Sequence, residues 1–97
     1  MSEGIPKSFW LKVITPRKLV VDDKVEAVSL PSLEGYLGIL PGHRPLLVAV
    51  GRGRLSFRIA EKEREISVQG GYAEILPEKV IVFTEMTEHD SEQSLEG

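Results

Sequence analysis

The sequence predicts an all-β domain. Short runs rich in β-branched and aromatic residues recur along the chain, and turn-forming residues separate them at intervals of about ten residues. No stretch shows the i, i+3, i+4, i+7 spacing of apolar residues that marks an amphipathic helix. Because every connection is short, successive strands are expected to be antiparallel neighbours in a sandwich or barrel.

The first half of the chain supplies three expected strands. Residues 9–14 are apolar apart from one lysine, and Trp10 is expected to lie in the core or at its rim. Residues 18–21 form the second run, and residues 25–30 form the third, after a charged turn at residues 22–24. This pattern predicts that the domain begins with a small antiparallel sheet.

The second half continues the pattern. Leu55, Phe57 and Ile59 alternate with shorter or polar residues, which places the apolar set on one face of a strand. Alternation returns over residues 65–69, whereas residues 79–84 are almost wholly apolar, as in a strand covered on both sides. The expected turns are Pro31-Ser32, Glu34-Gly35, Pro41-Gly42, Gly51-Arg52-Gly53, Glu61-Lys62, Gly70-Gly71 and Pro77-Glu78. Of these, Gly70-Gly71 is expected to be a bulge or tight bend within a sheet.

Composition narrows the possible functions. A length of 97 residues suits one domain, and 41% hydrophobic with 28% charged residues is ordinary for a soluble globular protein. The absence of cysteine excludes a disulfide framework, a thiolate metal site and a cysteine nucleophile. No apolar run approaches the ~18 residues of a membrane span, and the start of the chain resembles neither a signal nor a transit peptide.

The net charge of −3 is unevenly distributed. Five acids and no base occur from Glu85 onward, which leaves ten acids and all twelve bases before it. Neither part forms a polybasic stripe, so nucleic acid is not expected as a partner. We therefore divide the chain into a polar segment at 1–8, a domain at 9–87 and an acidic, disordered tail at 88–97.

The densest candidate site is the segment 34–47. Three glycines and two prolines restrict its backbone, because glycine permits positive φ and proline fixes φ near −65°. Leu37, Ile39 and Leu40 are expected to anchor it to the core, with His43 and Arg44 in its turn. A well-defined loop that carries Tyr, His and Arg is a natural place for a binding surface.

Catalytic interpretations find little support in the residues. A small enzyme that uses His43 with a carboxylate is one alternative, but no serine has a nucleophile-elbow context. A histidine beside Gly and Pro is more often a turn residue with one backbone hydrogen bond. The run 51–54 (Gly-Arg-Gly-Arg) lacks the Lys-Ser/Thr ending of a phosphate loop and is expected to be a hairpin turn. No catalytic residue, metal site or cofactor is predicted.

Four motifs occur in a distinctive order. They are Val13-Ile14-Thr15-Pro16, then Glu34-Gly35-x-x-Gly38-Ile39-Leu40-Pro41-Gly42-His43-x-Pro45-Leu46-Leu47, then Gly51-x-Gly53, and last Gly70-Gly71-Tyr72-Ala73-Glu74-Ile75 followed by Pro77 and Lys79-Val80. Together they resemble the N-terminal domain of the epsilon subunit of F-type ATP synthases. The resemblance covers about residues 9–86, and four ordered motifs are far more specific than any one of them.

The resemblance implies a fold and a role. The family's domain is a flattened β-sandwich of about ten short antiparallel strands in two sheets, with no catalytic residues of its own. It belongs to the central stalk, where it binds the gamma subunit, rests on the polar loops of the c-subunit ring and acts on the catalytic alpha/beta head indirectly. The chain would then help to couple ion translocation to ATP synthesis. It would lie peripherally on the cytoplasmic face of the bacterial inner or plasma membrane, or on the stromal side of the thylakoid.

The resemblance also implies roles for residues. The loop that faces the c ring is Ser32, Glu34, Gly35, Tyr36 and Leu37. The positions that face gamma are Thr15, His43 and Val48. The residues that shape turns are Gly38, Pro41, Gly42, Gly70 and Gly71. Many family members carry an acid at the position of Tyr36, which leaves Glu34 as the expected partner of basic groups on the ring.

Family members usually continue into a C-terminal hairpin of two helices, which can inhibit ATP hydrolysis and in some members binds ATP. Residues 88–97 are too few and too polar to form that hairpin, so neither property is expected here. One further alternative stays open. It is a stand-alone β-sandwich module that binds a small ligand or peptide through the Gly-Pro loop, which a deep apolar pocket would favour.

Overall fold

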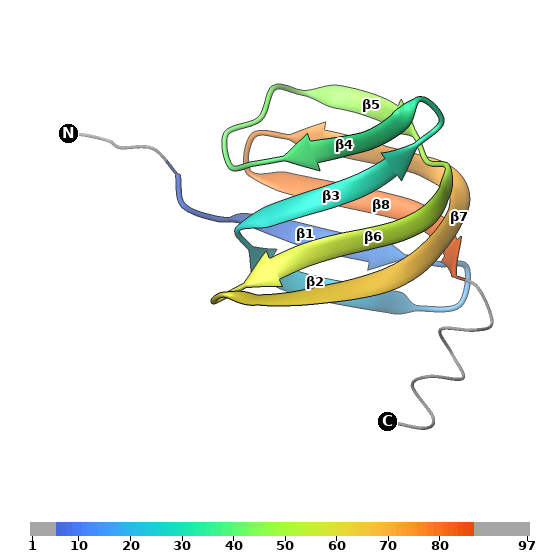
Figure 1. The fold of residues 1–97 in the computed structure, drawn as a ribbon, viewed down its shortest axis with the longest axis horizontal. Helices are drawn as coiled ribbons and strands as arrows, with labels where there is room; N and C mark the ends of the chain where they lie inside the picture. Colours follow the sequence, from blue (N-terminus) through green and yellow to red (C-terminus); the bar gives the residue numbers. More distant parts are fainter. Residues whose placement is uncertain (1–5, 87–97) are drawn as a thin grey trace.

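The computed structural model describes residues 6–86, and within them the fold is built from strands without a helix. Figure 1 shows the arrangement. The strands are β1 (Phe9–Ile14), β2 (Leu19–Val25), β3 (Ala27–Ser32), β4 (Gly35–Ile39), β5 (Leu46–Ala49), β6 (Arg52–Ile59), β7 (Lys62–Leu76) and β8 (Lys79–Met86). In the described part of the chain, therefore, no helix is long and apolar enough to cross a membrane.

The strands form two layers that share β7. The hydrogen-bonded order is β2-β1-β8-β7-β6-β3-β4, and β5 also pairs with β7. The first part of β7 pairs with β6, whereas its last part lies between β5 and β8. One layer thus contains β4, β3, β6 and the start of β7, and the other contains β5, the end of β7, β8, β1 and β2 (Figure 1). The predicted all-β sandwich is confirmed. Residues 6–86 form eight strands instead of the expected ten or so, and one continuous sheet is folded into both layers.

The fold in the sheet comes from a bend in β7. Gly70 and Gly71 have φ angles of +73° and +95°, which residues with a side chain rarely adopt. The pairing of β7 with β8 shifts register between Gln69 and Tyr72, so the two glycines form a β-bulge. The buried hydroxyl of Thr84 donates a hydrogen bond of 2.6 Å to the carbonyl of Gly70. The bend predicted at Gly70-Gly71 is confirmed.

The first and last strands pair in parallel, with Trp10 opposite Lys79 and Ile14 opposite Phe83. The expectation that all strands are antiparallel is therefore wrong for β1 and β8. Among the described strands, successive ones are antiparallel neighbours as expected in β1–β2, β3–β4, β6–β7 and β7–β8, but β2–β3, β4–β5 and β5–β6 do not pair with each other. Short connections fix the relative direction only of strands that follow one another, and β1 and β8 lie at opposite ends of the chain. Each takes its direction from its own antiparallel neighbour, β1 from β2 and β8 from β7.

Besides Gly70-Gly71, three expected turns are parts of strands. Residues 22–24 lie within β2 and pair with β1, and the charged side chains are tolerated because β2 is an edge strand. Pro31 and Ser32 end β3, while Arg52 and Gly53 begin β6. The turns at Pro41-Gly42 and Pro77-Glu78 are confirmed.

The core lies between the two layers and confirms the predicted alternation in β6, where Leu55 and Phe57 are buried. Trp10, however, is 44% exposed, because Phe9 and Leu11 on either side of it take the inward positions. In β8 only one face is fully buried, since Ile81 and Phe83 are half-buried. The buried hydrophobic residues are Phe9, Leu11, Val13, Val21, Val25, Val28, Leu30, Ile39, Val50, Leu55, Phe57, Val68, Ala73, Ile75, Val80 and Val82.

Candidate functional site: the β3–β4 hairpin and its groove

The hairpin between β3 and β4 has a tightly fixed tip. Leu33 and Glu34 form the turn, and Gly35 follows with a φ of +123°. The Ser32 hydroxyl donates to the Gly35 carbonyl at 2.5 Å and accepts from the Glu34 N–H at 3.2 Å. These local bonds hold the turn in one shape. They leave Leu33 (74% exposed) and Glu34 projecting into solvent.

A groove of about 460 Å³ separates this hairpin from β5. Its lining includes all five residues predicted to face the c ring, together with Val48 from the set predicted to face gamma. Glu34 is the one charged residue among those that line it. The lining residues are Ser32, Leu33, Glu34, Gly35, Tyr36, Leu37, Leu46, Leu47, Val48 and Ala49.

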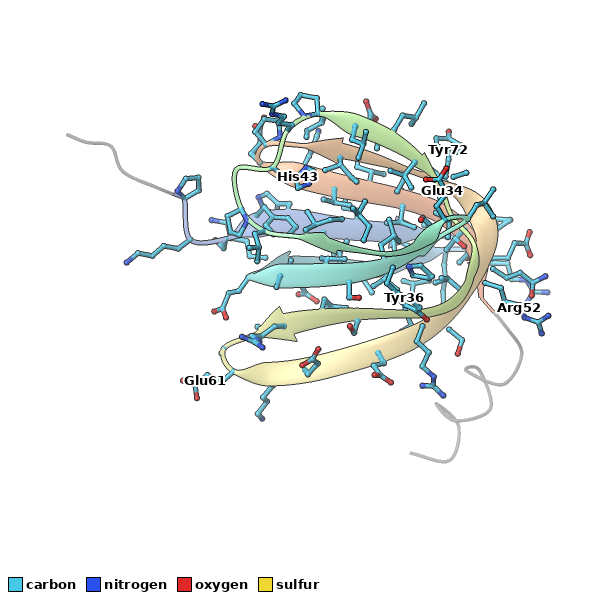
Figure 2. All side chains as sticks on the ribbon, turned by 45° about the horizontal axis from the view of Figure 1, so that its top comes forward. Glu34, Tyr36, His43, Arg52, Glu61 and Tyr72 are labelled. Carbon is cyan, nitrogen blue, oxygen red and sulfur yellow. The ribbon has the colours of Figure 1, made fainter. Side chains whose placement is uncertain are left out.

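Tyr36 is fixed against β6, the strand beyond β3 in the same layer. Its hydroxyl accepts a hydrogen bond of 3.1 Å from the backbone N–H of Arg54, which lies on β6 (Figure 2). A Cβ atom at Gly53 would stand 2.5 Å from the same hydroxyl, so the glycine leaves room for the tyrosine. The glycine-arginine run at 51–54 is therefore the start of a strand that receives Tyr36, and the hairpin turn expected there is wrong.

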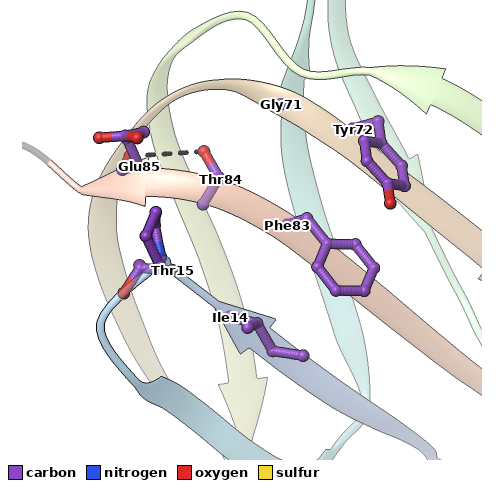
Figure 3. Close-up of a pocket in the computed structure, with 8 residues that line it drawn as sticks. Ile14, Thr15, Gly71, Tyr72, Phe83, Thr84 and Glu85 are labelled. Carbon is purple, nitrogen blue, oxygen red and sulfur yellow. Dashed lines mark hydrogen bonds between the residues drawn. The ribbon is translucent and has the colours of Figure 1, made fainter.

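Thr15 lies beside a second hollow, of about 450 Å³ (Figure 3). The Thr15 hydroxyl accepts from the backbone N–H groups of Arg17 and Lys18 at 3.2 Å, so it shapes the connection from β1 to β2. The rings of Tyr72 and Phe83 line the hollow with their centroids 5.0 Å apart. Both hollows are open to solvent, and neither is the deep apolar pocket that would favour a stand-alone ligand-binding module.

His43 lies at the other end of the domain from Glu34 (Figure 2). Its Nδ1–H donates a hydrogen bond of 2.8 Å to the carbonyl of the next residue, Arg44, as expected for a turn histidine. Residues 6–86 hold no group of three or more His, Asp or Glu side chains that could bind a metal ion. Leu40, expected to anchor this loop, is 63% exposed, whereas Ile39 is buried.

The structure thus places the residues with predicted roles in three locations. The five residues predicted to face the ring share the groove with Val48, Thr15 lies in the second hollow, and His43 lies at the far end. The sequence pattern did not predict the strand β5, although the side chains of Leu46 and Leu47 on it are exposed. The sequence does contain an indication of this strand and its exposed side chains. Four apolar residues follow Pro45, and no polar residue alternates with them to form an outer face.

Comparison with known proteins shows the family to which the chain belongs. The chain matches the family described as "ATP synthase, Delta/Epsilon chain, beta-sandwich domain" over residues 8–90. The ATP synthase epsilon chain of Koribacter versatilis is 39% identical over 85 residues, which cover 88% of this chain and 60% of that protein. The epsilon chain of Solibacter usitatus is 40% identical over 88 residues, which cover 91% of this chain and 66% of that protein. The chain therefore spans less than two-thirds of the length of these two relatives.

Solved structures have the same fold. One chain of the Euglena gracilis mitochondrial ATP synthase, from a structure of its OSCP/F1/c-ring, has a TM-score of 0.77 at 21% identity and matches 99% of this chain with 66% of its own length. A chain of the Tetrahymena thermophila mitochondrial ATP synthase central stalk and c-ring has a TM-score of 0.67 at 14% identity, over 86% of this chain and 66% of that one. The fold, the four motifs and the match across residues 8–90 lead to one conclusion: this chain belongs to the delta/epsilon-chain β-sandwich family of ATP synthases.

Proposed function

We propose that this chain is a non-catalytic rotor subunit in the central stalk of an F-type ATP synthase. It would link the gamma subunit to the c-subunit ring and help to couple ion translocation to ATP synthesis. The observation that carries the proposal is the family match, which extends over every strand of the described domain. The complex would hold the chain peripherally at the membrane, on its cytoplasmic side or on the stromal side of a thylakoid.

The groove residues are the proposed contact with the c ring. Ser32, Glu34, Gly35, Tyr36 and Leu37 lie together at one end of the domain, and the turn that carries Glu34 is held by local hydrogen bonds. A rigid, protruding tip suits the transmission of torque because it cannot yield under load. Glu34 would pair with a basic group on the ring.

The gamma contact is proposed at Thr15, His43 and Val48. Thr15 directly follows the end of β1, and His43 lies in the connection from β4 to β5 on the opposite side of the domain (Figure 1). A contact with all three residues would therefore extend along the length of the domain. An extended contact is consistent with a subunit that turns as one body with its partner.

Co-purification from the native host tests the proposed function. The chain is tagged, expressed in its own host and recovered from gently solubilised membranes, and the co-eluting proteins are identified by mass spectrometry. Recovery of gamma, the c ring and the catalytic subunits is expected. Recovery of the chain without them, from a host whose synthase assembles normally, would overturn the proposal.

Charge reversal tests the role of Glu34. In the same host, Glu34→Lys should lower ATP synthesis by inverted membrane vesicles, because two like charges would face each other at the ring. Glu61→Lys is the matched control: Glu61 is also an exposed turn glutamate, on the β6–β7 hairpin away from the groove (Figure 2). Equal rates of ATP synthesis in the two variants would remove Glu34 from the contact.

A further inference from the structure

The strands on the two sides of the groove each have one free edge. Within the described residues, β4 pairs only with β3 and β5 pairs only with β7, so no ladder of hydrogen bonds joins β4 to β5. Within the described residues the two sides are joined beside the hairpin turn, where Ser32 and Val50 form an isolated bridge and the Leu33 N–H donates to the Ala49 carbonyl at 3.3 Å. Beyond that bond the groove lies open between β4 and β5.

The backbone groups on the β4 side point into this opening. The carbonyl of Pro31 accepts from the N–H of Gly51, so Pro31 directs its backbone away from β4. Tyr36 is the cross-strand partner of Pro31. In an antiparallel pair, the backbone N–H and C=O groups of two opposed residues point either toward each other or away from each other. Because the Pro31 carbonyl points away from β4, the N–H and C=O of Tyr36 point away from β3. Gly38, two residues further along, has the same orientation.

The β5 side presents a matching set. The N–H of Val50 donates to the Gly71 carbonyl, so Val50 and alternate residues before it face β7. Leu47 and Ala49 therefore face the groove, and the bond from Leu33 to the Ala49 carbonyl agrees with this orientation. In the described part of the chain, no hydrogen bond satisfies the N–H and C=O of Leu47.

The side chains in the groove favour an apolar strand with one positive charge. Leu37 and Val48 are half-buried and pack against the core from the two sides of the opening. Leu33 and Leu47, which line the groove from its two sides, are 74% and 69% exposed, so the lining presents apolar side chains to solvent. Glu34 at the rim supplies the one charge of the lining and has no ion-pair partner within residues 6–86.

We propose that the free edges of β4 and β5 receive an extended segment of a partner subunit as an additional strand. The partner's backbone would hydrogen-bond to Tyr36 and Leu47, as in β-strand addition. Its inward side chains are apolar and cover Leu37 and Val48, and it carries a basic residue opposite Glu34. The proposal rests on the proposed function in one respect, namely that the segment comes from the c-subunit ring, which the groove residues are proposed to contact. It adds a mode of binding to what the family resemblance implies.

Amide hydrogen exchange tests this proposal directly. The tagged chain is measured alone and in the complex that co-purifies with it, and the exchange rates of Tyr36, Gly38 and Leu47 are compared. Strand addition should slow the Tyr36 and Leu47 amides by at least about tenfold, because each would gain a protected hydrogen bond. A complex that contains synthase subunits but leaves both rates unchanged overturns the strand addition and leaves the proposed function standing. A chain recovered alone overturns both.

Two variants at Leu47 separate backbone from side-chain binding. Leu47→Pro removes an N–H that faces the groove, and an edge strand tolerates proline there because β7 does not use that N–H. Leu47→Ala keeps the N–H and removes the side chain. Leu47→Pro should lower the yield of complex by at least about tenfold more than Leu47→Ala. Equal yields would overturn the proposal, as would a bound lipid or a second copy of the chain in place of a partner segment. If Leu47→Pro does not fold, the exchange measurement decides.

Discussion

At the tip of the β3–β4 hairpin, the phenol of Tyr36 connects two strands that are not neighbours. It reaches across β3 to the N–H of Arg54 on β6, and Gly53 leaves the space that the phenol occupies. Among the residues that line the groove, Tyr36 is thus held by a contact between strands as well as by its own turn. The family resemblance predicted that Tyr36 lies on the ring-facing surface, at a position where many family members carry an acid. The structure adds that its phenol holds β4 against β6.

Removing the Tyr36 hydroxyl should loosen the hairpin without unfolding the domain. Tyr36→Phe is expected to lower the free energy of unfolding by about 0.5–1.5 kcal/mol, the usual worth of one hydrogen bond. The amide of Arg54 should exchange faster in the same variant. Both quantities follow from urea unfolding and from hydrogen exchange by NMR.

Tyr72→Phe serves as the control for this measurement. Tyr72 is also an exposed tyrosine, and its hydroxyl makes no hydrogen bond within the described residues. Its unfolding free energy should stay within about 0.5 kcal/mol of the original protein. Equal losses in the two variants would show that the Arg54 contact does not hold the hairpin.

At the scale of the element, β7 decides the architecture. A straight strand of its length would keep β5, β6 and β8 in one layer, but the bulge at Gly70 and Gly71 sends its two parts into different layers. Gly71 is the tighter of the two positions, because an added Cβ would collide with the backbone carbonyl of Phe83. At Gly70 the same atom would meet nothing within 4 Å.

The loss of unfolding free energy caused by an alanine substitution should increase from Gly38 to Gly70 and from Gly70 to Gly71. Gly38→Ala, in open space at an ordinary φ, should change the unfolding free energy by no more than about 0.5 kcal/mol. Gly70→Ala should cost about 1–2 kcal/mol for its left-handed backbone. Gly71→Ala adds a steric clash to the same strain and should cost more than about 3 kcal/mol or prevent folding. Equal effects at Gly70 and Gly71, measured by urea unfolding, would contradict the role given to the Phe83 carbonyl.

At the scale of the whole molecule, one parallel pair of strands joins the beginning of the domain's sequence to its end. β1 and β8 are the first and last strands, and they lie side by side in the middle of their layer (Figure 1). That layer can form only after almost the whole domain has been assembled. A fold dominated by such distant pairings loses much chain entropy before its contacts form.

Refolding should therefore be slow for a chain of this size. We expect a relaxation in the range of milliseconds to seconds after dilution from urea. Trp10 is the single tryptophan, and it lies on β1 opposite both Lys24 and Lys79, so its fluorescence reports when this layer forms. Stopped-flow refolding that finishes within microseconds would contradict the topology.

The sequence by itself determined the fold class, the bend at Gly70-Gly71, the turn at the hairpin tip and the family. These features depend on local chemistry: alternation of apolar residues, glycine at positive φ, and a serine that bonds its own turn. The tertiary structure decided what local patterns do not encode. It placed Trp10 outside the core, kept charged residues 22–24 in an edge strand and paired β1 with β8 in parallel. It also left β4 and β5 unpaired across the groove, because strand partners are chosen by distant segments that compete for the same backbone groups.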